Sequence, residues 1–85
     1  MNEANRKPVT LLSVISSRPF GRGFSSYRNG EPFDPDAFYR LNDQWAYERG
    51  RLFAAYYSGA LRINRRIAWE AKAAASEALR HGALI

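Results

Sequence analysis

The side chains of this sequence best suited to chemistry are arginines, and they stand close to aromatic residues. Of the 13 cationic residues, only Lys7 and Lys72 are lysine and the others are arginine. A guanidinium group presents a planar fork of N–H donors to phosphate or carboxylate, and its face stacks on aromatic rings. With a net charge of +5 and a pI near 10.1, this bias indicates recognition of nucleic acid, a nucleoprotein or an acidic protein surface. The alternative is that the charge serves only solubility.

The sequence lacks the residue combinations that catalysis requires, namely a titratable group held by a second one. No cysteine is present, and the single histidine, His81, stands at an expected helix end, where it complements the helix dipole. Asp34 and Asp36 are accounted for by helix capping. The eight acidic residues are scattered, whereas a divalent metal needs clustered ligands. We therefore predict a protein that is not an enzyme and that holds no metal and no cofactor.

The first predicted binding feature is an arginine cluster followed by a tryptophan: Arg62, Arg65, Arg66 and Trp69. Near the start of a helix these cations oppose the helix dipole, which a sequence shaped by stability alone would avoid. The helical projection places Trp69 on the same charged face, where an indole suits base stacking or an interface hot spot. Two alternatives remain open. The arginines lie in the turn between the two predicted helices or pair with Asp43, Glu48 or Glu70, or Trp69 is covered by the N-terminal segment.

The second predicted feature is the segment 18–28, in which arginine alternates with aromatic residues. Its cations are Arg18, Arg22 and Arg28. In a flexible chain, such a segment can track phosphates while its rings stack on bases. Alternatively, the segment is an ordered arm whose phenylalanine and tyrosine side chains fill the core.

The segment Trp45-Ala-Tyr-Glu-Arg-Gly-Arg51, followed by Leu-Phe-Ala-Ala, resembles a helix found in small accessory proteins of bacteriophages and other mobile elements. It also distantly resembles the Trp/Arg/Gly helices of ribosome-modulation-factor-like proteins. The resemblance covers about a fifth of the chain and brings no catalytic residues. It implies a non-enzymatic, host-modulating protein that docks on a nucleoprotein machine.

The pattern of apolar residues predicts a mainly α fold built on an antiparallel helix pair, at about 35–58 and 60–81. Asp34 and Pro35 are typical of an N-cap and a first helical position. Helical periodicity gives the first helix this core stripe: Phe38, Leu41, Trp45, Leu52 and Tyr56. A glycine inside this helix, Gly50, suggests a closely packed neighbour, because glycine costs about 1 kcal/mol there relative to alanine.

The second predicted helix has a low apolar face that suits close helix packing: Ala60, Ile63, Ile67, Ala71, Ala74 and Ala78. Gly82 supplies the cap just past its end. Three tyrosines, Tyr39, Tyr47 and Tyr57, project away from the stripe of the first helix. We therefore expect that helix to have a second contact surface, for a docked protein or a homodimer.

The N-terminal third is predicted to form an extended arm, residues 9–33, after a disordered tail, residues 1–8. Residues 9–15 are apolar and β-branched, which favours a short strand, and residues 18–33 favour a loop or a strand pair. Asn29-Gly30 is typical of a two-residue hairpin turn. The whole chain, 1–85, is predicted to be one small domain whose residues 34–85 form the helical hairpin.

These observations lead to one leading function and two alternatives. The leading function is a basic binding module that docks on nucleic acid or a nucleoprotein through its arginine and tryptophan surface. The first alternative is a phage- or mobile-element-encoded inhibitor or accessory protein that docks on an acidic host protein complex, and the second is a structural homo-oligomer. No apolar run is long enough to cross a membrane, and the absence of cysteine fits a reducing compartment, so we expect a cytoplasmic protein.

Overall fold

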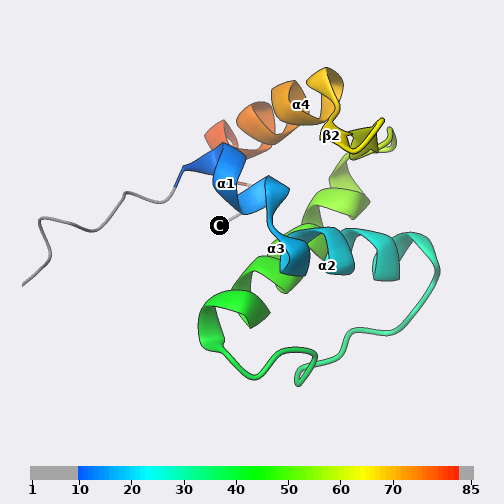
Figure 1. The fold of residues 1–85 in the computed structure, drawn as a ribbon, viewed down its shortest axis with the longest axis vertical. Helices are drawn as coiled ribbons and strands as arrows, with labels where there is room; N and C mark the ends of the chain where they lie inside the picture. Colours follow the sequence, from blue (N-terminus) through cyan, green and yellow to red (C-terminus); the bar gives the residue numbers. More distant parts are fainter. Residues whose placement is uncertain (1–9, 83–85) are drawn as a thin grey trace, which may run out of the picture.

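The computed structural model describes residues 10–82, and the predicted tail, residues 1–8, lies outside the described residues. Within this range the fold is mainly helical, as predicted, and it also contains one small antiparallel hairpin (Figure 1). The elements in chain order are α1 Leu11–Ser16, α2 Arg18–Arg28, α3 Leu41–Tyr56, β1 Arg62–Ile63, β2 Arg66–Ile67 and α4 Trp69–Arg80.

The arm predicted as a strand and a loop is helical, and side-chain caps explain why. Thr10 and Ser13 form a reciprocal capping box at the start of α1, with N···Oγ distances of 3.1 and 3.2 Å. Ser17 ends α1 and caps α2 by accepting a hydrogen bond from the Phe20 N–H. The prediction of an extended arm was wrong because these serine and threonine caps outweigh the weak β preference of a short apolar run.

The Asn29-Gly30 pair ends α2 and does not form the predicted hairpin turn. Gly30 has a φ of +75°, and its N–H donates to the carbonyl of Tyr27 while the Glu31 N–H donates to that of Ser26. This is the Schellman arrangement that satisfies the last carbonyls of a helix. The prediction that this pair tolerates positive φ is correct for Gly30, but the conformation ends helix α2 instead of joining two strands.

The helix predicted from residue 35 begins six positions later, at Leu41. The Asp34 carboxylate accepts a hydrogen bond from the Asp36 N–H and so closes a turn instead of starting a helix. Gln44 then holds the loop, since its Oε1 accepts from the Phe38 N–H and its Nε2 donates to the Asp34 carbonyl, both at about 3 Å. A buried polar side chain from α3 thus satisfies backbone groups that a longer helix would have paired.

The packing of α3 on α2 reverses the predicted core face. Gly23 of α2 faces the backbone of α3, and Gly50 of α3 faces the backbone of α2. A Cβ atom at Gly50 would lie 2.9 Å from the carbonyl carbon of Phe20. Contact this close confirms the prediction that something packs tightly against Gly50. The predicted core stripe was wrong, because Leu41 is 87% exposed and Trp45, Leu52 and Tyr56 are also exposed. The small residues on the opposite face let the two helices approach, so that face is buried.

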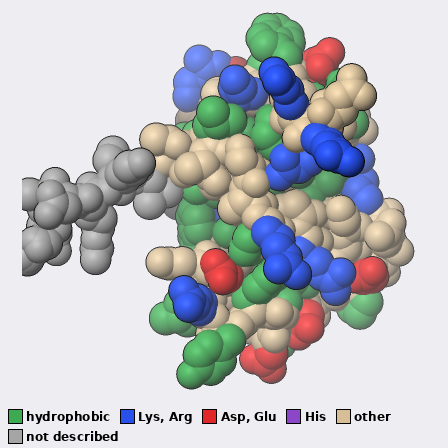
Figure 2. Space-filling view, viewed as in Figure 1, with side chains coloured by type: hydrophobic (Ala, Val, Ile, Leu, Met, Phe, Trp, Pro, Cys, Tyr) green, Lys and Arg blue, Asp and Glu red, His purple; other side chains and the backbone are tan. Residues whose placement is uncertain are grey.

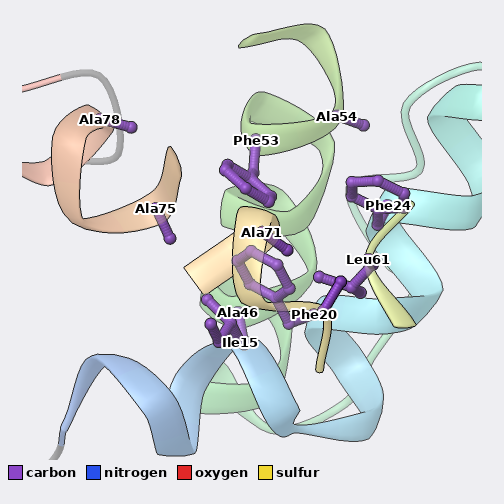
Figure 3. Close-up of a cluster of buried hydrophobic side chains, with 11 residues drawn as sticks. Ile15, Phe20, Phe24, Ala46, Phe53, Ala54, Leu61, Ala71, Ala75 and Ala78 are labelled. Carbon is purple, nitrogen blue, oxygen red and sulfur yellow. The ribbon is translucent and has the colours of Figure 1, made fainter. Parts of the chain in front are cut away.

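The core lies between α2, α3 and α4, with Ile15 of α1 at one edge (Figure 3). Phe53 lies between two rings of α2, with centroid distances of 5.8 Å to Phe20 and 5.9 Å to Phe24. The alanine face of α4 closes this core through the fully buried residues Ala71, Ala75 and Ala78. The predicted alanine face is confirmed for α4, and so is the cap, since Gly82 has a φ of +74° just past the helix.

The first part of the predicted second helix is a β-hairpin. Arg62 pairs with Ile67 and Ile63 with Arg66, so Ala60, Ile63 and Ile67 are not on a helix. The turn residues Asn64 and Arg65 have φ values of +53° and +69°, as in a type I′ turn. The helix prediction failed here because neither turn residue is glycine. In consequence, α3 packs more extensively on α2 than on α4.

Candidate nucleic-acid interface

The hairpin carries the predicted arginine cluster. Arg62, Arg65 and Arg66 are all exposed. They do not lie at a helix N-terminus as predicted: Arg62 and Arg66 are on the strands, and Arg65 is in the turn, as the alternative had it. A two-residue turn holds these three side chains within a short stretch of backbone. The hairpin therefore forms a compact positively charged projection.

A groove joins this hairpin to α2. It has a volume of about 720 Å³ and runs between one face of α2 and the segment 60–62. Arg18, Arg28 and Arg62 line it together with Ser16, Ser17 and Ser25. The structure thus brings together arginines that are more than thirty positions apart in sequence. In Figure 2, cationic side chains gather over the hairpin and over α2, and several acidic side chains lie lower, over the loop that precedes α3.

Two of the groove arginines are held in place by backbone carbonyls. Arg28 donates through Nη2 to the carbonyls of Tyr57 and, at 2.8 Å, Gly59, and its guanidinium lies 4.3 Å above the ring of Phe24. Arg62 donates through Nη2 to the Ser16 carbonyl at 2.8 Å. A guanidinium has five N–H donors, so both retain donors for a further partner. Their positions are fixed before any partner binds.

The arginines of the groove and the hairpin are not neutralised by carboxylates within the described residues. The salt bridges between residues 10 and 82 join Glu48 to Arg49 and Glu77 to Arg80 and His81. The hydrogen bond with His81 is the main reason that the pKa of Glu77 is lowered, and the hydrogen bond from Arg80 lowers it further. The alternative that Arg62, Arg65 and Arg66 pair with Asp43, Glu48 or Glu70 does not hold in the structure.

Trp69 is the first residue of α4 and is 76% exposed. Among residues 10–82, therefore, no part of the N-terminal segment covers it. The Ala68 N–H donates to the Leu61 carbonyl at 2.9 Å, which extends the hairpin pairing by one step. Trp69 follows this pair, and the next residue on the other strand, Ala60, lines the groove. The backbone of Trp69 thus lies beside the segment 60–62, although its indole is not among the side chains that line the groove.

Arg22 and the three tyrosines do not join this surface. Arg22 lines a separate hollow together with Glu31 and Asp34. Tyr47 is only 2% exposed, and its hydroxyl accepts a hydrogen bond from the Asp34 N–H. Tyr57 stacks on Phe53 at 5.0 Å and donates its hydroxyl hydrogen to the Ala60 carbonyl.

The expectation that all three tyrosines project away from the core was therefore wrong. Tyr47 and Tyr57 pack inside the fold, because the face of α3 that carries Tyr47 is the one that α2 covers. Tyr39 alone among them is fully exposed, at 101%.

Sequence reasoning missed two features of the surface. One is the set of serines that line the groove, for which the sequence offers no signal beyond the frequency of serine. The other is the exposed apolar stripe of α3, formed by Leu41, Trp45, Leu52 and Tyr56. Its helical spacing was recognised and was assigned to the core.

In residues 10–82 no group of three or more His, Asp or Glu side chains is placed to hold a metal ion. No helix of this described range is both long and apolar enough to cross a membrane. Comparison of the chain with protein-family models, with curated proteins and with solved structures found no match.

Proposed function

We propose that this protein is a non-enzymatic basic binding module that docks on nucleic acid or a nucleoprotein complex. One observation carries the proposal: Arg18, Arg28 and Arg62 converge on one groove, and no described carboxylate pairs with them. Arg65 and Arg66 extend the same positive surface to the hairpin turn. Phosphate groups match the fork geometry of these guanidinium groups, and fixed arginines lose little freedom on binding.

Binding to phosphates makes a quantitative prediction about salt. Each phosphate neutralised by a cation adds about 0.7–0.9 to the slope of log K against log salt concentration, because counterions are released. Arg18 is exposed and forms no salt bridge or side-chain hydrogen bond within residues 10–82, so replacing it should spare the fold. We expect Arg18→Ala to reduce the slope by about one such increment.

The matched control is Arg40→Ala, which removes the same charge from the loop before α3, away from the groove. It should leave the slope unchanged. Fluorescence anisotropy of a labelled oligonucleotide, titrated at several salt concentrations, measures both variants. Binding that is absent at about 50 mM salt, or insensitive to salt, would rule out the proposed function.

A second candidate, a docking inhibitor or accessory protein on a host protein complex, is supported by the exposed stripe of α3. An apolar face of α3 is left uncovered by the rest of residues 10–82, formed by Leu41, Trp45, Leu52 and Tyr56. Such faces are typical of protein interfaces. The resemblance of segment 45–51 to accessory proteins of mobile elements is consistent with this candidate. Leu52→Asp should abolish capture of a protein partner from nuclease-treated lysate, while oligonucleotide binding persists.

The same stripe would serve a structural homo-oligomer, for which the mass in solution is the test. A cytoplasmic location is part of the proposal, because the absence of cysteine fits a reducing compartment.

A further inference from the structure

The groove between α2 and the segment 60–62 has the form of a channel for one strand. We propose that the basic surface binds single-stranded nucleic acid, with backbone phosphates along the groove and a base stacked on Trp69. This inference rests on the proposed function and specifies its ligand.

The elements that could read a duplex are unsuited to it. The major groove of a duplex admits a protruding helix or a two-stranded ribbon. Each hairpin strand has two residues, so the ribbon extends only about 7 Å at 3.3 Å per residue. The outward face of α3 is the apolar stripe, and α4 carries Glu70 and Glu77 beside Lys72 and Arg80.

The arginines of α2 are exposed along one side of an open groove. Arg18 and Arg28 lie at the two ends of the helix, and at 1.5 Å per residue they are separated by about 15 Å along its axis. Arg62 lines the other side of the groove from the segment 60–62. A single backbone lying along this groove would have cations on two sides.

The interior of the groove favours a flexible, partly apolar chain. Phe24 and Leu61, both buried, contribute apolar surface, and Gly21 leaves open space because nothing lies within 4 Å of the position of a Cβ atom. Ser25 adds a hydroxyl group that suits sugars and phosphates, whereas Ser16 and Ser17 donate their hydroxyl hydrogens to the carbonyls of Leu12 and Val14. Such a mixture of charge, hydroxyl and apolar surface is suited to an unpaired strand.

Trp69 supplies the stacking platform that single strands require. Trp69 is 76% exposed, and the backbone pairing of Leu61 with Ala68 places its backbone beside the segment 60–62 and next to the hairpin arginines. In a duplex the bases are already stacked on one another and are closed to an external ring. An unpaired base has a free face, and stacking on an aromatic side chain is a sequence-tolerant source of affinity.

The test compares a labelled oligothymidylate of about 12 nucleotides, an oligouridylate of the same length and a matched duplex by fluorescence anisotropy. We expect at least about tenfold tighter binding of either single strand than of the duplex. Trp69→Ala should weaken single-strand binding roughly 5- to 150-fold, and circular dichroism should show an unchanged fold because the side chain is exposed. Trp45→Phe, on the stripe of α3, should leave affinity unchanged and leaves Trp69 as the sole indole, whose fluorescence single strands should quench.

The outcomes separate this inference from the proposed function. Equal or tighter binding of the duplex, with the salt slope retained, would overturn single-strand preference and leave the proposed function in place. Single-strand binding that is unaffected by Trp69→Ala would overturn the stacking role. Failure of all three oligonucleotides to bind at about 50 mM salt would overturn the proposed function itself.

Discussion

The crossing of α2 and α3 depends on two glycines, and Gly50→Ala is the sharpest perturbation of it. A Cβ atom at residue 50 would overlap the Phe20 carbonyl oxygen and would lie 3.0 Å from the backbone nitrogen of Phe24. The reciprocal contact places a Cβ atom at Gly23 2.9 Å from the carbonyl carbon of Tyr47. Backbone atoms cannot rotate out of the way, so the two helices must separate.

The expected magnitude follows from two opposing effects. Alanine is favoured over glycine inside a helix by about 1 kcal/mol. Against this, overpacking a well-packed contact costs about 1–3 kcal/mol, and separation also loosens the rings of Phe20 and Phe24 around Phe53. Because the overlap is with backbone atoms, we expect the overpacking cost to reach or exceed about 3 kcal/mol. After the gain in helix propensity is subtracted, the free energy of unfolding should fall by about 2 kcal/mol or more. In a domain of this size that lowers Tm by roughly 8–16 °C.

Gly21→Ala is the matched control in the same structural unit. Gly21 lies within α2, two residues before Gly23, and nothing lies within 4 Å of a Cβ atom built there. This substitution should therefore stabilise the fold by about 0.5–1 kcal/mol through helix propensity alone. Urea and thermal denaturation followed by circular dichroism measure both variants. If Gly50→Ala is as stable as the wild type, or if Gly21→Ala is equally harmful, the close crossing does not exist as described.

Two further predictions concern the hairpin turn and the end of α4. Arg65 has a φ of +69°, where a non-glycine residue costs roughly 1–2 kcal/mol, and glycine gives back about 0.5–1 kcal/mol of that through its greater loss of entropy on folding. Arg65→Gly should therefore stabilise the fold by about 1 kcal/mol and raise Tm by about 4–8 °C, while lowering the salt slope of oligonucleotide binding by about 0.7–0.9. A variant that loses both stability and affinity would contradict this. The pKa of Glu77 is lowered from its usual 4.5 in the folded state, so its contribution to stability is present above that pH and is lost as the pH falls further. Because the carboxylate is exposed, the effect is small: the wild type should unfold at a slightly higher temperature than Glu77→Gln at neutral pH and at the same temperature in strong acid. A difference that grows as the pH falls would refute the sign.

The sequence predicted correctly those features that depend on local chemistry or on exposure. The helical class follows from periodicity, and the end of α4 follows from glycine's tolerance of positive φ at Gly82. The cluster of Arg62, Arg65 and Arg66 was expected on the surface, because buried unpaired guanidinium groups are rare, and Trp69 was expected among them. These predictions required no knowledge of which helix packs on which.

The side of α3 that is buried could not be read from hydrophobicity. The larger and more apolar stripe, with Leu41 and Trp45, is outside, whereas the face that includes Gly50 is inside. Periodicity identifies both faces and ranks them by hydrophobicity alone. Which one is buried depends on how closely α2 can approach, and therefore on the glycine that α2 presents at the crossing.

By itself the sequence determined that this is a small, mainly helical protein with an exposed set of arginines around Trp69. Only the tertiary structure decided that Arg18 and Arg28 share a groove with Arg62, and that Arg22 does not. The physical reason is that residues distant in sequence meet only where backbones pack. That packing is set by the Gly23–Gly50 crossing and by the type I′ hairpin. Local propensities indicated a close neighbour at Gly50 but not which helix supplies it, and they did not indicate the hairpin.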